Sequence, residues 1–203
     1  MTEKLSGKLI VGITGATGTI FGVRLLQILE GTGIETHLVM SKWAARTLIH
    51  ETPYTAEEVQ QMAACYYQST DQGATISSGS FLTRGMIIAP CSVRTLAAIA
   101  CGMGDNLIHR AADVILKERR KLVLMVREAP LNDIHLENML KLSRMGAVIS
   151  PPVPAFYNQP RSLDDIVNHT VQRALDQFEI HIDVVSRWDG VMSRGGKVSK
   201  VSE

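Results

Sequence analysis

Several kinds of residue are scarce in this 203-residue sequence, and each scarcity narrows the function. The only cysteines are Cys65, Cys91 and Cys101, an odd number without a CxxC pair, so we expect a reducing cytoplasm and no disulfide framework or structural zinc site. Lysine and arginine total 21 against 20 aspartates and glutamates, which disfavours a nucleic-acid-binding protein that relies on bulk positive charge. No apolar run approaches the roughly 20 residues that cross a bilayer. Residues 1–8 are not followed by the long apolar segment of a secretory signal.

Small aliphatic residues dominate what is present. Hydrophobic residues make up 45% of the chain, but only 5% of residues are aromatic. Short unbroken apolar runs alternate with amphipathic stretches, which is typical of parallel strands covered by helices. We therefore expect one α/β domain over residues 1–189, with a parallel sheet and helices on both faces. The polar tail at 190–203, rich in Gly, Ser and Lys, is expected to be flexible or recruited by a partner.

The order of the predicted elements locates a candidate site. Predicted strands cover residues 8–14, 34–40, 86–89, 122–126 and 147–149, and predicted helices cover 21–29, 42–49, 92–100, 107–120, 134–145 and 163–180. In such sheets the ligand crevice lies outside the carboxyl ends of the strands. The segments found there are 15–18, 41–42, 91–92, 127–128 and 151–157. Their glycines, hydroxyls and single arginine favour a phosphate-bearing ligand.

The glycine-rich loop at 12–18 (GITGATG) follows the first predicted strand. Glycines there permit a tight turn and let backbone amides approach an anion at a helix N-terminus. The loop lacks the Gly-Lys-Ser/Thr of a P-loop. A dinucleotide is disfavoured because Ser41-Lys42, not an acidic residue or an arginine, ends the second strand, and no tyrosine is followed four residues later by lysine. A mononucleotide fits better, and a turn without a ligand remains the alternative.

Other polar residues each have a structural and a functional interpretation. Ser92 and Thr95 suit a helix N-cap, a phosphate contact or both. Cys91 is expected to be a small buried residue, not a nucleophile. Arg110 and Lys117 share one helix face with Asp113 and are consistent with either a phosphate site or a solvated ion-pair surface.

The charged pair Arg127-Glu128 follows a buried strand, where it is harder to explain as surface. The arginine offers a planar fork for phosphate, and the glutamate offers an acid or base. Glu51 is a second candidate carboxylate. His109 and His135 lack metal-ligand spacing, so we expect them to be satisfied or exposed, and we expect no metal site.

Ordered blocks along the chain carry a resemblance to a known family. They are residues 12–18 (GITGATG), 39–42 (VMSK), 90–92 (PCS), 110–113 (RAAD), 116–120 (LKERR), 126–130 (VREAP), 135–140 (HLENML), 151–157 (PPVPAFY) and 187–188 (RW). In these blocks the chain resembles the flavin prenyltransferase family, the UbiX-like proteins formerly called phenylacrylate or hydroxyarylate decarboxylases. The resemblance implies a flavodoxin-like Rossmann fold, a cytoplasmic homododecamer and a reaction that needs no metal.

The resemblance also implies a reaction and its residues. A dimethylallyl group from dimethylallyl phosphate is joined to N5 and C6 of reduced FMN, and the prenylated FMN serves UbiD-type decarboxylases. The implied FMN-binding residues are Gly15, Ala16, Thr17, Ser41, Ser92, Val93, Arg94, Thr95 and Arg127. The implied donor-binding residues are Arg110, Lys117, Tyr157 and Arg173. The implied catalytic residues are Glu51, Ser92, Lys117, Glu128 and Trp188, with Glu51 contributed by the same or a neighbouring subunit. Thr17 stands where the family often has serine.

Two alternatives stay open. One is an FMN-dependent decarboxylase of the peptidyl-cysteine type, which shares this fold. The other is a non-catalytic flavin carrier within a hydroxyarylate decarboxylase. The implied substrate loop and the Arg110, Lys117 and Arg173 set favour the prenyl reaction.

Overall fold

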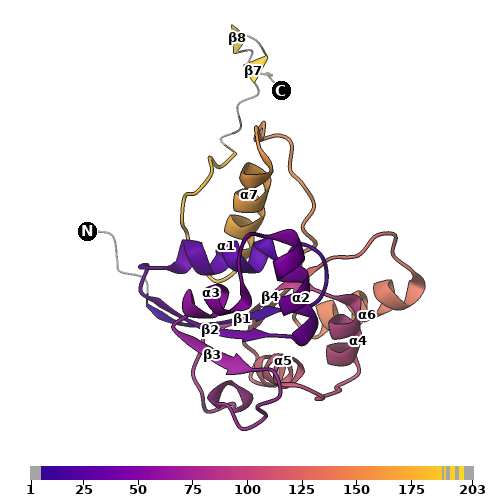
Figure 1. Cartoon of the computed structure of the whole chain (residues 1–203). Coiled ribbons are helices and arrows are strands. Elements are labelled where there is room, and N and C mark those ends of the chain that lie inside the picture. The colour runs from indigo at the N-terminus through magenta and orange to yellow at the C-terminus, as the bar shows by residue number, and fades with distance from the viewer. Residues whose placement is uncertain (1–5, 189, 191–192, 195–196, 199–203) are drawn as a thin grey trace.

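A six-stranded parallel sheet forms the centre of the chain in a computed structural model that describes residues 6–188, 190, 193–194 and 197–198 (Figure 1). The strand order is β3-β2-β1-β4-β5-β6. The strands are β1 (Gly7–Ile13), β2 (Ile34–Met40), β3 (Cys65–Gln68), β4 (Gly85–Cys91), β5 (Lys121–Val126) and β6 (Val148–Ile149). The predicted α/β class, with a parallel sheet, is confirmed.

Helices cover both faces of this sheet, as predicted. One face carries α1 (Ile20–Leu29), α2 (Lys42–Glu51), α3 (Ala56–Gln61) and α7 (Leu163–Asp176). The other face carries α4 (Val93–Ala100), α5 (Leu107–Lys117), α6 (Asp133–Arg144) and the short 3₁₀ turn η1 (Thr75–Ser77). Because side chains alternate along a strand, Leu9 and Val11 of β1 pack under the first group and Ile10 packs under the second. The single sheet therefore separates two apolar clusters.

The strand order creates a switch point between β1 and β4. From β1 the chain passes through α1 to β2 on one side, and from β4 it passes through α4 and α5 to β5 on the other. Connections that diverge in this way leave a crevice outside the carboxyl ends of the two central strands, where ligands bind in doubly wound sheets. The sequence-predicted loops after β1 and β4 both lie there.

The structure adds elements that the sequence pattern did not predict. Strand β3 has only four residues, of alternating exposure, and lies at the sheet edge. Helix α3 has six residues, most of them polar, and begins with a capping box between Thr55 and Glu58. Two predicted helices end earlier than expected, α5 at Lys117 and α7 at Asp176.

The predicted tail at 190–203 falls largely outside the described residues. Within it, Ser193–Arg194 and Lys197–Val198 pair in antiparallel fashion as β7 and β8. Among the described residues, no helix is long and apolar enough to cross a membrane.

Candidate functional site

Hydrogen bonds through Thr14 join the carboxyl ends of β1 and β4. The Thr14 hydroxyl donates to the Pro90 carbonyl at 2.7 Å and accepts from the Ser92 amide at 2.8 Å. The Thr14 side chain is almost fully buried. These contacts fix the position of Ser92, although Thr14 was not among the predicted site residues.

A cleft of about 670 Å³ opens at this switch point. Five of the predicted FMN-binding residues line it: Gly15, Ser41, Ser92, Arg94 and Thr95. Thr14, Asn106 and His109 also line it and were not among the predicted site residues. The remaining predicted FMN contacts, Ala16, Thr17, Val93 and Arg127, do not line the cleft, and their role remains a prediction.

Three helix N-termini surround the cleft. Ser41 caps α2 by accepting from the Ala44 amide at 3.0 Å, and Ser92 caps α4 by accepting from the Thr95 amide at 3.3 Å. Asn106 caps α5 in the same way. Helix N-termini carry partial positive charge and free amides, so an anion is favoured where they converge. The capping role predicted for Ser92 is confirmed.

Gly15 leaves space that a side chain would fill. A Cβ at this position would lie 2.5 Å from Cβ of Trp43, so any larger residue would displace the start of α2. Gly18 ends the loop with φ of +94°, a conformation that glycine adopts without strain. The glycines are therefore required by close approach and backbone conformation.

His109 differs from its prediction. It was expected to be satisfied or exposed, but it is 5% exposed and its Nδ1 has no hydrogen-bond partner among the described residues. Burial lowers the pKa of His109; Asp105 raises it and Arg94 lowers it further. The sequence-based expectation failed because nothing in the spacing shows that α5 begins at the cleft. His135, in contrast, is partly exposed and joins a capping box with Asn132.

Glu51 lies on the N-terminus of α1. Its carboxylate accepts from the amides of Gly18 at 2.9 Å and Thr19 at 3.1 Å, and from the Thr19 hydroxyl at 3.0 Å. Burial alone would raise the pKa of Glu51, but hydrogen bonds from Thr17, Gly18 and Thr19 outweigh it and lower the pKa. Glu51 is thus an ionised helix cap in this chain. Its catalytic role remains a prediction.

A second cleft, of about 380 Å³, brings together Tyr157, Arg173 and Trp188. The rings of Tyr157 and Trp188 meet edge to face with centroids 5.8 Å apart. The Tyr157 hydroxyl lies 3.1 Å from Nε2 of His169, which was not a predicted site residue. The spacing of these residues in the sequence gave no pairing, so the resemblance alone predicted that they act together.

Asp176 holds the cations of this second cleft in place. Its carboxylate accepts two hydrogen bonds from Arg187, both at 2.9 Å, and one from Arg173 at 2.9 Å. It also lies 3.1 Å from Nδ1 of His181. Burial would raise the pKa of Asp176, but Arg187, His181 and Arg173 together lower it. One carboxylate therefore fixes two arginines whose positive charge exceeds its own.

Four predicted charged residues line neither cleft. Arg110 donates to the Ser77 carbonyl and pairs with Asp113 at 2.8 Å, and Lys117 pairs with Glu118. Both therefore face the η1 side of α5, which confirms the predicted shared face. Lys117 is eight residues beyond His109, about 12 Å along the helix. Arg127 and Glu128 follow β5 and are exposed.

Cys91 is buried, and burial raises the pKa of its thiol to about 12. A thiol with such a pKa stays protonated at neutral pH and is a poor nucleophile. The predicted structural interpretation of Cys91 is confirmed.

Comparisons with known proteins assign the family. A family model described as Flavoprotein matches residues 1–175. A protein of Bacillus subtilis named "Probable UbiX-like flavin prenyltransferase" is 61% identical over 189 residues, covering 93% of each chain. This chain belongs to the UbiX-like flavin prenyltransferase family. Membership fits the cleft at the switch point and the second cleft with its two arginines.

Two solved structures of the UbiX-like family share this fold. A dodecameric FMN-dependent Ubix-like decarboxylase from Escherichia coli O157:H7 is 60% identical, with a TM-score of 0.88, and the match covers 90% of this chain and 100% of that one. AnUbiX (PadA1), in complex with FMN and dimethylallyl pyrophosphate, is 49% identical with a TM-score of 0.90, covering 92% and 99%. Both matches extend over almost the whole described UbiX-like fold.

Proposed function

We propose that this chain is a metal-independent flavin prenyltransferase that joins a dimethylallyl group to N5 and C6 of reduced FMN. The observation that carries the proposal is the pair of clefts within one UbiX-like chain. One is lined by hydroxyls and helix N-termini, and the other by aromatic rings and arginines. The first suits a flavin mononucleotide, and the second suits an allylic phosphate.

The residues of the switch-point cleft fit FMN. The missing Cβ of Gly15 leaves room beside Trp43, and the buried Nδ1 of His109 lacks a partner that a polar ligand atom would supply. Ser41 and Ser92 present hydroxyls and helix amides to a phosphate. When bound, reduced FMN supplies the nucleophilic atoms of the reaction.

The second cleft fits the donor. Breaking an allylic C–O bond releases phosphate and leaves an electron-poor allyl group, so the site needs fixed positive charge and aromatic faces. Arg173 and Arg187 supply that charge, and Tyr157 and Trp188 supply the faces. Glu128 is proposed to protonate the leaving phosphate. The released phosphate would then accept the proton that leaves C6 when the second bond forms.

Assembly is proposed to complete the site. Arg110 and Lys117 face η1 in the single chain, away from Tyr157 and Arg173. A dodecamer like that of the E. coli relative would let α5 of one subunit approach the second cleft of another. Mixing inactive Lys117→Ala and Arg173→Ala proteins during refolding should then restore activity. Absence of any recovery in mixed oligomers would contradict the shared site.

Anaerobic incubation of the pure protein with reduced FMN and an allylic donor tests the function directly. The donors are dimethylallyl phosphate and, in a parallel reaction, the diphosphate. A gain of one prenyl unit on FMN, measured by mass spectrometry, supports the transferase. Unmodified FMN with decarboxylated peptidyl cysteine would instead indicate the decarboxylase, and unmodified FMN with neither product would indicate a carrier.

Two substitutions test the residue roles. Glu128→Gln and Arg173→Ala should abolish prenyl transfer while FMN stays bound, because neither residue lines the FMN cleft. Arg144→Ala, a change at an exposed arginine of α6, is the matched control and should remain active. Wild-type turnover in either test variant would refute its assignment.

The product is proposed to serve UbiD-type decarboxylases in the cytoplasm. The three unpaired cysteines are compatible with a reducing compartment. The reaction mixture should activate a UbiD-type apoenzyme, whereas the mixture made with Arg173→Ala should leave it inactive.

A further inference from the structure

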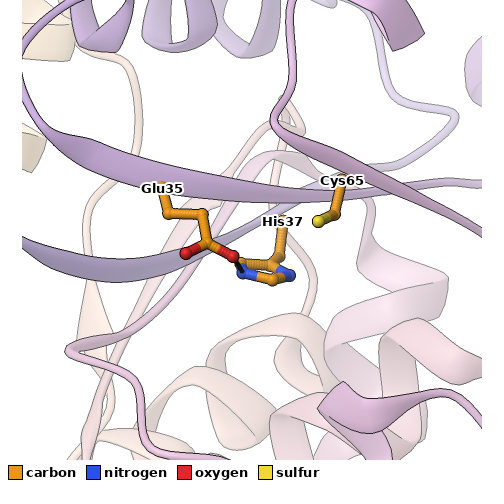
Figure 2. A group of neighbouring side chains, drawn as sticks. All are labelled: Glu35, His37 and Cys65. Atoms are coloured by element: carbon orange, nitrogen blue, oxygen red, sulfur yellow. Dashed lines mark ion pairs between the residues drawn. The ribbon is translucent and has the colours of Figure 1, made fainter.

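Three potential metal-binding side chains meet on the edge of the sheet, in a cluster of Glu35, His37 and Cys65 (Figure 2). Glu35 and His37 are two residues apart on β2, so they project from the same face. Cys65 of β3 is paired directly with His37 in the parallel register, and its side chain joins them. The three ligand atoms all lie within 4.8 Å of one another. Strand pairing therefore builds the cluster from residues that no local motif connects.

His37 is held in place with one ring nitrogen unsatisfied. Its side chain is 2% exposed, and its Nδ1 lies 2.9 Å from the hydroxyl of Tyr67, which in turn contacts Thr75 at 2.9 Å. The ring of Phe81 packs edge to face against it. Nε2 lies 2.9 Å from the Glu35 carboxylate but has no hydrogen-bond partner among the described residues.

The arrangement of His37 resembles that of a metal ligand before it binds. Ligating histidines usually bond a second group through the other ring nitrogen, which fixes the ring and its tautomer. Tyr67 is such a group here. Burial lowers the pKa of His37, with Lys8 adding to this and Glu35 opposing it, so the ring is neutral and its Nε2 lone pair is available. A buried polar atom without a partner otherwise destabilises the fold.

We propose that Glu35, His37 and Cys65 bind one zinc-class divalent cation. Imidazole nitrogen, thiolate sulfur and carboxylate oxygen are the ligands that zinc prefers, and three of them leave a fourth tetrahedral position for water. On binding, the Cys65 thiol loses its proton to solvent. The two negative charges of Cys65 and Glu35 then balance the cation.

Small movements are enough to complete this geometry. Zinc bonds of about 2.0 to 2.3 Å place tetrahedral ligands roughly 3.5 Å apart, somewhat closer than the 4.8 Å limit found here. Glu35 and Cys65 are both partly exposed at the sheet edge, so their side chains can rotate to close the gap. Lys8 lies 4.0 Å from the Glu35 carboxylate, over the ring of Phe81. Its ammonium opposes a cation and should weaken binding.

The site is separate from the proposed catalytic clefts. Glu35 is near the start of β2, whereas the switch-point cleft follows the end of that strand at Ser41. The cation would tie the four-residue edge strand β3 to β2 and protect its unpaired edge from fraying. Its expected effect is therefore on stability, and prenyl transfer should not require it.

Metal titration of the full chain, purified without a histidine tag and stripped with a chelator, tests the proposal. Zinc should bind at one ion per chain and raise the unfolding temperature. Cobalt should give a thiolate charge-transfer band and the d–d spectrum of a tetrahedral ion. Cys65→Ser should weaken binding at least about 100-fold, since even changes around a ligand cost roughly 10- to 100-fold.

Two further variants make the outcome decisive. Cys101→Ser removes an exposed cysteine elsewhere and should bind metal as the wild type does. Lys8→Met should bind more tightly, because it removes the competing ammonium. Equal zinc affinity in the wild type and Cys65→Ser, or cobalt binding without a thiolate band, would overturn the proposal. So would metal binding that leaves the unfolding temperature unchanged.

Discussion

Replacing Thr14 by valine removes a hydroxyl while keeping the shape of the side chain. In the structure this hydroxyl donates to the Pro90 carbonyl at 2.7 Å and accepts from the Ser92 amide at 2.8 Å. The Pro90 carbonyl keeps a second donor, the Thr14 amide at 3.2 Å, but the Ser92 amide loses its acceptor. The change therefore acts at the join between β1 and β4.

The magnitude follows from these contacts. Each hydrogen bond contributes about 1 kcal/mol net, and an amide left unsatisfied in a buried site costs about 1 to 3 kcal/mol. Thr14 is 1% exposed, so water has little access to the vacated position. We expect Thr14→Val to lower the free energy of unfolding by about 3 kcal/mol. FMN affinity should fall as well, because Ser92 loses the contact that positions it.

Urea unfolding at a fixed protein concentration measures the stability change, and flavin fluorescence measures binding. Thr14→Ser is the matched control: it keeps the hydroxyl and loses one methyl group, a change of about 1 kcal/mol. The reasoning is refuted if Thr14→Val is as stable as Thr14→Ser.

Three other substitutions test the two clefts and the α1 cap. Gly15→Ala places a Cβ 2.5 Å from that of Trp43, so FMN binding should weaken more than tenfold while circular dichroism stays unchanged; retained affinity would contradict this. Asp176→Asn removes the charge that fixes Arg187, so the KM for the allylic donor should rise several-fold with FMN affinity unchanged, measured by steady-state kinetics. The pKa of Glu51 is lowered on folding, so its stabilising effect is present above the ordinary carboxyl pKa and lost as pH falls through the lowered value. The stability difference between wild type and Glu51→Gln, from urea unfolding, should shrink on acidification, and a pH-independent difference would count against the capping role.

Apolar strands and the site loops that follow them were predictable because both depend on local sequence. Runs such as residues 8–14 and 122–126 are continuous and rich in aliphatic residues, so their burial in a parallel sheet follows directly. Strand β3 was missed because an edge strand alternates in exposure and is stabilised by pairing, which no local pattern reveals.

The candidate site was predictable only in part. Glycines and hydroxyls after β1 and β4 could be placed by the rule for parallel sheets, and they line the switch-point cleft. His109 and Thr14 could not, because their contribution depends on where α5 begins and on a bond between distant strands. The same limit applies to Glu35, His37 and Cys65, which only strand register brings together.

The division of the interior into two clusters bears on how the protein tolerates change. Leu26 of α1 and Leu96 of α4 are both fully buried, but they belong to clusters on opposite faces of the sheet. Truncations at such separated positions usually add without coupling. One face can therefore accumulate compensating substitutions while the packing of the other stays intact, so the two halves of the interior are free to diverge independently during evolution.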